Sequence, residues 1–389
     1  MTPWAGRFVK DAEADIRAWL SERGLLYREE MTTHSYPFCW RCDSPLLYYA
    51  WKTWYIATTR YREQLLAAHR SVAWHPADVG ANRFGSWLEN NVDWALSRNR
   101  YWGTPLNVWR CAGCGADLCV GSIEELRRGR GVPDPLDLHR PYVDAVTFPC
   151  ERCGGEMRRV PEVIDAWFDS GAMPYAQWHY PFENTEEFEA NFPADFIAEG
   201  MDQTRGWFYT LMAIAVHVSG RAPYRNVLPN ELVLDKLGKK MHKSRGNAVD
   251  PNVPLTERGA DALRFYLIHT SPTWTSTRFD PDGVTEVTKK LLGTLRNVAQ
   301  FFALYANIDG YDPGAREAAA PALLDRWILS RLHSLARLCV SALDDYDLTR
   351  GARAIQEFVI EELSNWYVRR SPMTLPLIVP FPPLARSML

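Results

Sequence analysis

Residues 238–247 read Gly-Lys-Lys-Met-His-Lys-Ser-Arg-Gly-Asn. Three lysines and an arginine lie between two glycines, together with the hydroxyl of Ser244. The run before them, residues 231–234 (Glu-Leu-Val-Leu), has the composition of a strand, and Asp250-Pro251 behind them marks a turn. A basic loop after a strand can close over a polyphosphate and neutralise charge that builds during phosphoryl or nucleotidyl transfer. The alternative for such a loop is an ordinary solvated surface.

Three other stretches narrow these alternatives. Residues 199–208 read Glu-Gly-Met-Asp-Gln-Thr-Arg-Gly-Trp-Phe, residues 165–171 read Asp-Ala-Trp-Phe-Asp-Ser-Gly, and residues 90–105 end in Arg-Tyr-Trp-Gly-Thr-Pro. Residues 240–244 resemble the Lys-Met-Ser-Lys-Ser signature of class I aminoacyl-tRNA synthetases, with His242 in place of the first serine. The other stretches resemble isoleucyl-tRNA synthetases, and the similarity extends over most of the chain. Valine enzymes lack the Asp-Gln-Thr-Arg-Gly-Trp run, so the resemblance favours isoleucine.

The resemblance implies roles for single residues of the basic loop. Lys240, Lys243 and Ser244 are expected to be catalytic, and Lys243 is expected to bind ATP. The two lysines would stabilise the triphosphate as pyrophosphate leaves. ATP also implies Mg²⁺, although no dedicated magnesium cage is visible in the sequence.

The acidic stretch is expected to bind isoleucine and its adenylate. The resemblance assigns Glu199 to the adenylate, whereas the carboxylate of Asp202 can pair with the ammonium group of the amino acid. Gln203 can donate a hydrogen bond nearby, and Trp207 can form a wall for an aliphatic side chain. The alternative is a helix start with acidic residues in its first turn. Core packing is the alternative for the aromatic residues within 165–171.

Six of the eight cysteines form Cys-x-x-Cys pairs, which favours metal binding over disulfides. Two pairs can supply four thiolates for a tetrahedral Zn²⁺ ion, and flanking glycines permit the tight turns around it. A redox pair or coincidence are the alternatives. By resemblance, the third pair is half of a second site whose other half lies outside the chain. The predicted ligands are Cys111, Cys114, Cys150 and Cys153, with Cys39 and Cys42 as the half-site.

The composition is that of a globular protein of two or three domains, with 389 residues, 47% of them hydrophobic and 23% charged. A net charge of −3 confers no overall attraction to nucleic acid, so RNA binding requires local basic patches. Because no apolar run approaches the ~20 residues of a membrane span and no secretory signal is seen, we expect a cytoplasmic protein. We also expect a monomer that binds no membrane.

Strand and helix patterns alternate up to about residue 250, which predicts an α/β fold with a parallel sheet. Helical periodicity over 289–307, 324–339 and 348–368 then predicts a bundle, with Asp347 as an N-cap. Residues 46–49 and 54–59 also have strand composition. By resemblance, the expected parts are an editing remnant and connector (1–90), the second half of a Rossmann-like nucleotide-binding domain (91–250) with a zinc knuckle (109–160), a stem-contact connector (251–288), an anticodon-binding helical bundle (289–371) and an atypical Pro-rich tail (372–389).

No element like His-Ile-Gly-His is found, so the chain is expected to be a fragment of an isoleucine–tRNA ligase. The reaction implied is ATP-dependent activation of L-isoleucine, followed by transfer to tRNA(Ile), and the chain alone is expected to be inactive. Two alternatives stay open. One is a non-catalytic, zinc-containing RNA-binding protein derived from a synthetase, and the other is a valine- or leucine-specific synthetase.

Overall fold

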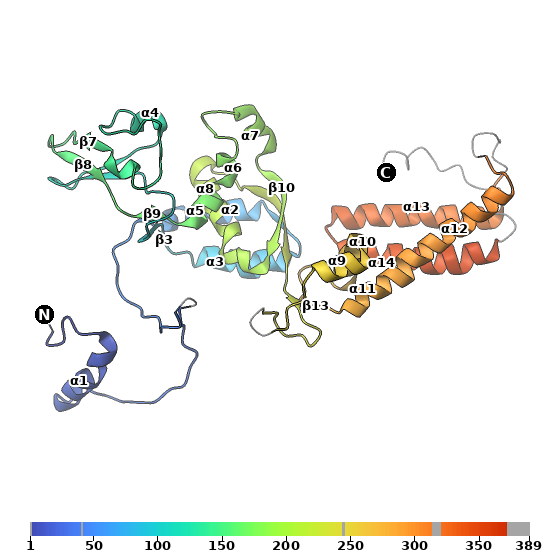
Figure 1. The fold of residues 1–389 in the computed structure, drawn as a ribbon, viewed down its shortest axis with the longest axis horizontal. Coiled ribbons are helices and arrows are strands. Elements are labelled where there is room, and N and C mark those ends of the chain that lie inside the picture. Colours follow the sequence, from blue (N-terminus) through green and yellow to red (C-terminus); the bar gives the residue numbers. More distant parts are fainter. Residues whose placement is uncertain (1, 40–41, 243–245, 313–319, 372–389) are drawn as a thin grey trace. The chain divides into compact units, whose positions relative to one another are not determined.

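The computed structural model describes residues 2–39, 42–242, 246–312 and 320–371 (Figure 1). The chain divides into two compact units, Met1–Lys52 and Thr53–Leu389. None of the helices in the described ranges is long and apolar enough to cross a membrane.

The described residues of the first unit form one helix, α1 (Val9–Glu22), whose Trp19 packs edge-to-face on Trp4. The predicted strand over residues 46–49 is wrong, because these residues form no strand and Tyr48 is 99% exposed. Strand composition stabilises a strand only when a neighbouring strand supplies partners. The described backbone here offers only an isolated bridge between Phe38 and Pro45.

The second unit is built on a parallel sheet with the strand order β10-β11-β2. Strand β10 (Ala194–Gly200) pairs with β11 (Tyr224–Asn230), and β11 pairs with β2 (Ala73–Trp74). Helix α8 (Trp207–Ser219) connects β10 to β11, as the alternating pattern predicted. It ends at Gly220, whose φ of +69° is the left-handed conformation that favours glycine after a helix.

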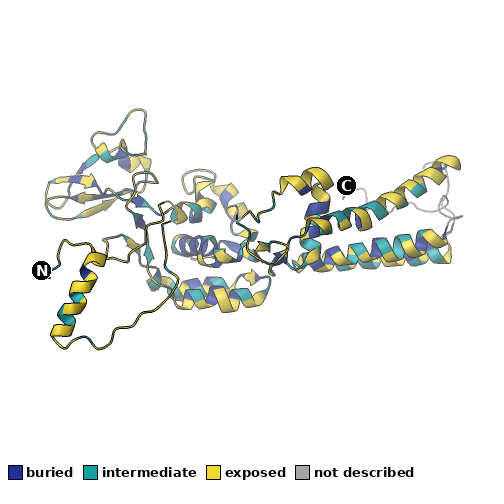
Figure 2. Cartoon of the chain, turned by 60° about the horizontal axis from the view of Figure 1, so that its bottom comes forward, coloured by how far each residue is buried: buried dark blue, intermediate teal, exposed yellow. Residues whose placement is uncertain are grey.

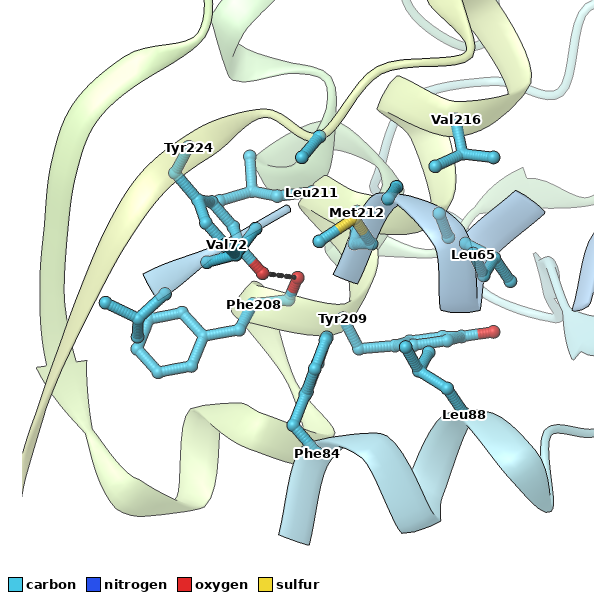
Figure 3. Close-up of a cluster of buried hydrophobic side chains, with 14 of the residues drawn as sticks. Leu65, Val72, Phe84, Leu88, Phe208, Tyr209, Leu211, Met212, Val216 and Tyr224 are labelled. Carbon is cyan, nitrogen blue, oxygen red and sulfur yellow. Dashed lines mark hydrogen bonds between the residues drawn. The ribbon is translucent and has the colours of Figure 1, made fainter. Parts of the chain in front are cut away.

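Helix α8 is the centre of the main hydrophobic core. All of its residues from Phe208 to Val216 are buried, as expected for a helix that is apolar all round. Side chains from α2 (Arg62–Arg70) and α3 (Ser86–Glu89) pack in the same cluster. The buried hydroxyl of Tyr224 on β11 donates a hydrogen bond of 2.9 Å to the carbonyl of Phe208 (Figure 3). This packing fixes where α8 begins, and therefore where the residues before it lie.

A four-stranded antiparallel sheet, in the order β6-β5-β8-β7, forms the zinc-knuckle region predicted from the cysteines. Its small core includes Trp109, whose Nε1 donates a 2.7 Å hydrogen bond to the carbonyl of Val146. The strands are β5 (Val108–Cys111), β6 (Asp117–Cys119), β7 (Thr147–Pro149) and β8 (Glu156–Arg159).

Other short elements of the second unit lie within or between these sheets or flank the basic loop. The strands are β1 (Tyr55–Ile56), β3 (Trp94–Ala95), β4 (Ser97–Arg98), β9 (Val163–Ile164), β12 (Val233–Leu234) and β13 (Thr277–Arg278). The helices are α4 (Ile123–Leu126), α5 (Ala166–Gly171), α6 (Met173–Ala176) and α7 (Thr185–Asn191).

The C-terminal part is helical, as the periodicity predicted, and its helices bury one side and expose the other (Figure 2). The carboxylate of Asp347 accepts a hydrogen bond from the N–H of Arg350, which confirms the predicted N-cap. The predicted helix over 348–368 is continuous but changes to wider π-type turns at Phe358. The elements are α9 (Asn252–Arg258), α10 (Ala260–Thr270), α11 (Pro281–Val287), the π-type turn η6 (Thr288–Leu292), α12 (Gly293–Ile308), α13 (Leu323–Asp344), α14 (Leu348–Glu357) and η7 (Phe358–Val368).

Candidate functional site

The acidic stretch lies at the carboxyl end of the parallel sheet. Strand β10 ends with Glu199 and Gly200, and Gly200 pairs with Asn230 at the end of β11. A single 3₁₀ turn, Met201–Arg205, then leads into α8. Ligands of open α/β sheets bind at this edge, outside the carboxyl ends of the strands. The predicted substrate residues therefore occupy the position in the fold where a ligand is expected.

Hydrogen bonds link three of these residues. Gln203 donates through Nε2 to Asp202 Oδ2 at 3.1 Å and accepts through Oε1 from the Trp207 N–H at 3.0 Å. The side-chain amide is therefore held at both ends and caps the start of α8. A Cβ on Gly206 would lie 2.7 Å from Gln203 Oε1, so a larger residue there would displace this amide from its present position. Glu199 stands three residues before Asp202 and is exposed.

Helix α5 forms a second wall beside the start of α8. Trp207 donates through Nε1 to the carbonyl of Ser170 at 3.0 Å, which fixes the orientation of its indole ring. Trp167 on α5 is 44% exposed, and its ring lies close enough to Gly206 that a Cβ there would approach it to 3.3 Å. Core packing, the alternative for this stretch, applies to Phe168, which packs against a buried cluster, but not to Trp167.

Asp165 is a structural residue that sequence reasoning did not single out. It is buried and accepts hydrogen bonds from Arg98 Nη2 at 2.7 Å and from Trp94 Nε1 at 3.2 Å. It also caps the N-terminus of α5 through the Trp167 N–H. The signal for this role was an aspartate directly before a helical stretch.

The basic loop follows β12, which pairs in parallel with β13. Lys240 forms an isolated bridge with Leu234 and is exposed to solvent. The predicted residues Lys243 and Ser244 lie outside the described ranges. Among the described residues, no hydrogen bond or ion pair joins Lys240 to the group formed by Asp202, Gln203 and Trp207.

Asn247 closes the loop, a role that the sequence did not reveal. Its Nδ2 donates to Asp235 Oδ2 at 2.8 Å and to the carbonyl of Lys240 at 3.1 Å. Its Oδ1 accepts from the N–H of His242 at 2.9 Å. One side-chain amide therefore ties both ends of the loop together across 12 residues. The pKa of Asp235 is lowered, first by the Asn247 side chain and next by the Lys239 N–H.

An Asn247→Ala variant is expected to raise the pKa of the Asp235 carboxyl toward the ordinary value of about 3.9. Because the pKa of Asp235 is depressed in the folded state, its hydrogen bonds with Asn247 contribute folding stability at pH values above the unfolded-state pKa. This stability is lost as the pH falls through the folded-state pKa. Carboxyl-carbon NMR titration measures the change. Asn252→Ala is a matched control, because the side-chain amide of Asn252 donates its hydrogen bond to Asp250 and not to Asp235. An Asp235 pKa that stays low in Asn247→Ala would contradict the clamp.

The four predicted zinc ligands converge in the knuckle. Their sulfur atoms all lie within 4.8 Å of one another, with Cys111 to Cys153 at 3.5 Å and Cys114 to Cys150 at 3.6 Å. Sulfurs at Zn–S distances of about 2.3 Å in a tetrahedron are separated by about 3.8 Å, so the cluster fits zinc.

Charge and backbone shape also suit a metal at this cluster. The backbone N–H of Cys114 is the largest of several influences that lower the pKa of Cys111 to about 6. The Gly155 N–H has a lowering effect on the pKa of Cys153, but hydrogen bonds with the other three thiols outweigh it, so this pKa is raised. Coordination to a cation would favour the thiolate form of both. Gly115 and Gly154, which follow the two pairs, have φ values of +70° and +72°. Cys39 and Cys42 lie in a turn of the first unit, and among the described residues they form no cluster with a third metal-ligating side chain.

Two protein-family models and several isoleucine–tRNA ligases match this chain. Residues 9–280 match the family model of "tRNA synthetases class I (I, L, M and V)", and residues 325–376 match that of the "Anticodon-binding domain of tRNA ligase". Relatives include an isoleucine–tRNA ligase of Bacillus thuringiensis (strain Al Hakam), 54% identical over 369 residues, and one of Clostridium kluyveri, 50% identical over 373 residues. These matches cover 94% and 95% of this chain, which spans 36% of the length of each relative.

The fold has a counterpart among solved structures. Methionyl-tRNA synthetase of Mycobacterium tuberculosis, in complex with methionyl-adenylate, superposes with a TM-score of 0.63 at 18% identity. The match covers 89% of this chain and 58% of that protein. At this identity the likeness concerns the fold alone.

Proposed function

Because the chain belongs to the class I tRNA synthetases for isoleucine, leucine, methionine and valine, we propose that it is a segment of an isoleucine–tRNA ligase. The segment would contribute the amino-acid side of the adenylation site, the basic loop and part of the tRNA-binding surface. The observation that carries the proposal is the hydrogen-bonded group of Asp202, Gln203 and Trp207 at the carboxyl end of β10. Relatives at 50–54% identity that bear the isoleucine name support this choice of amino acid.

The arrangement suits recognition of an aliphatic α-amino acid. One oxygen of Asp202 accepts from Gln203, which leaves the carboxylate free to accept from an ammonium group as well. The indole of Trp207 is held by Ser170 and that of Trp167 lies against Gly206, so both rings lie at the start of α8, next to the Gln203 amide that bonds this carboxylate. A branched aliphatic side chain would be bound between them by removal of apolar surface from water.

The reaction proposed is attack by the isoleucine carboxylate on the α-phosphorus of ATP, with release of pyrophosphate. The protein would contribute positioning and charge stabilisation rather than a covalent nucleophile. Lys240 and Lys243 would neutralise the phosphates, and Mg²⁺ would accompany ATP. Zn²⁺ held by Cys111 and its three partner cysteines would stabilise the knuckle, a structural role that needs no open coordination position.

The second substrate would be tRNA(Ile). The helical part from α12 onward contains the residues that match the anticodon-binding model, and this match supports RNA as its ligand. The activated isoleucine would be transferred from the adenylate to the tRNA.

The test is the binding of a non-hydrolysable isoleucyl-adenylate analogue, measured by calorimetry against the leucyl, valyl and methionyl analogues. An Asp202→Asn variant is expected to bind the isoleucyl analogue about 10- to 150-fold more weakly, because a hydrogen bond to a charged group contributes ~1.5–3 kcal/mol. Asp195→Asn is the matched control, since Asp195 lies on β10, directly before the turn that carries Asp202, but pairs with Arg225. The proposal would be contradicted if another analogue bound more tightly than the isoleucyl one. It would also be contradicted if both variants lost the same affinity for the isoleucyl analogue.

A further inference from the structure

The loop between β4 and β5 presents two aromatic side chains to solvent. Tyr101 is 51% exposed and Trp102 is 73% exposed, and their rings meet edge-to-face at 5.4 Å. Exposed Arg100 precedes them in the sequence. Neither ring belongs to a hydrophobic cluster of the described chain, so core packing does not account for them.

A network of three charged residues fixes the position of this aromatic pair. The guanidinium of Arg140 lies 4.9 Å from the centre of the Tyr101 ring, and its Nη1 donates to the carbonyl of Arg100 at 3.5 Å. Its Nε donates to Asp144 Oδ2 at 2.8 Å, and the other oxygen of Asp144 accepts from Arg159 Nε at 2.6 Å. The loop is therefore tied to the zinc-knuckle sheet through three charged side chains.

The last member of this network is deeply buried. The Arg159 side chain is 1% exposed, and its Nη1 donates to the carbonyls of Leu106 at 3.2 Å and Glu162 at 2.9 Å. Burying an ion pair costs desolvation energy that its attraction does not reliably recover, so such pairs are weak stabilisers. They do fix geometry, because each donor must point at its acceptor. The network is therefore better explained by the position it gives the loop than by stability.

The loop also lies next to the proposed adenylate site. Thr104, two residues after Trp102, donates through Oγ1 to Asp169 Oδ2 at 2.9 Å. Asp169 belongs to α5, which packs on α8 and carries Trp167. Two residues of extended chain span at most ~7 Å, so Trp102 is close to this wall of the site.

We propose that Tyr101 and Trp102 form a stacking platform for an unpaired base of an RNA strand that enters the adenylate site. Arg140, Asp144 and Arg159 are the positioning residues that hold the platform. This inference rests on the proposed function, because the strand would be the single-stranded end of the tRNA that receives the amino acid.

The chemistry of the loop favours a single RNA strand over other partners. Aromatic rings bind unpaired bases by stacking, and a cation beside them suits the phosphate that follows each base. Exposed Arg100 supplies this cation. Bases within a duplex are stacked on one another and offer no free face to a protruding indole. Two rings are also a small apolar area for a stable protein interface, which typically buries about 800 Å² per partner.

The experiment compares two RNA hairpins with the same stem, one blunt and one with four unpaired 3′ nucleotides, by fluorescence anisotropy. The wild-type chain is expected to prefer the extended hairpin. Trp102→Ala is expected to weaken binding of the extended hairpin about 5- to 150-fold and leave the blunt hairpin unchanged. Trp102→Phe is expected to recover most of the preference. Trp51→Ala, at another exposed tryptophan, is the matched control and should keep the wild-type preference for the extended hairpin.

Arg140→Met tests the positioning role separately. It is expected to reduce the preference for the extended hairpin while zinc content and melting temperature stay near wild-type values, whereas a purely structural role would lower stability and spare the preference. The platform would be overturned if the wild-type chain did not prefer the extended hairpin, or if Trp102→Ala lost the same affinity for both hairpins. Either result would leave the aromatic pair as a contact for a protein. Adenylate-analogue binding, measured on the same proteins, reports on the proposed function independently.

Discussion

A Cys111→Ser variant is expected to lose the tightly bound zinc that the wild-type chain should carry at about one ion per chain. Four sulfurs within 4.8 Å form a complete tetrahedral set, and serine cannot replace a thiolate at this position. Structural zinc sites of this kind contribute ~10–16 kcal/mol of apparent binding free energy at neutral pH, the largest effect expected for any single change here. Metal analysis after dialysis against a chelator measures it.

The loss of zinc should also loosen the knuckle. Its core is small, and two of its buried members, Cys111 and Cys150, are themselves predicted ligands. Cys119→Ser is the matched control, because Cys119 is exposed on β6 and lies outside the four-sulfur cluster. Undiminished zinc in Cys111→Ser, or equal loss in Cys119→Ser, would refute the assignment.

Lys243→Ala is expected to lower the adenylation rate about 10²- to 10³-fold while isoleucine binding changes little. Charge on the departing pyrophosphate develops mainly in the transition state, and removing a group aimed at such charge costs ~2.7–4 kcal/mol. The assay is isoleucine-dependent pyrophosphate exchange. Because this chain spans 36% of its relatives, the exchange is measured in a chimera of the Bacillus relative in which this chain replaces the matched region.

Lys239→Ala is the matched control for the basic loop. Lys239 has the same side chain, but its described contacts are backbone hydrogen bonds to Asp235. The control should keep nearly the full exchange rate. A Lys243→Ala enzyme with a normal rate and only a raised KM for isoleucine would show that the lysine acts in amino-acid binding instead.

Features that depend on neighbouring residues in the chain were predictable. The strand, helix and strand around α8 follow from local periodicity, and the Asp347 cap follows from one side chain reaching the next turn. The convergence of four cysteines was predictable because Cys-x-x-Cys pairs have few structural uses in a protein of this class. The substrate role of Glu199, Asp202 and Trp207 stays a prediction from their order along the chain.

Features that depend on partners distant in sequence were not predictable. Residues 46–49 have strand composition but form no strand, because pairing needs a second strand that composition cannot supply. Asn247 gave no sign that its amide would reach Asp235, and nothing marked Arg98 as the partner of Asp165, 67 residues away. The same holds for Arg140 beneath Tyr101.

The sequence by itself determined the family resemblance, the four-cysteine cluster and the residue types at the proposed substrate site, since these reside in short motifs with their own chemistry. Only the tertiary structure decided how those residues are held: Gln203 between Asp202 and Trp207, and Asn247 across the basic loop. Hydrogen bonds act over about 3 Å, so each of them depends on where the fold places its donor and its acceptor. Local patterns specify elements, whereas the directions of individual donors and acceptors are set by the packing of the whole fold.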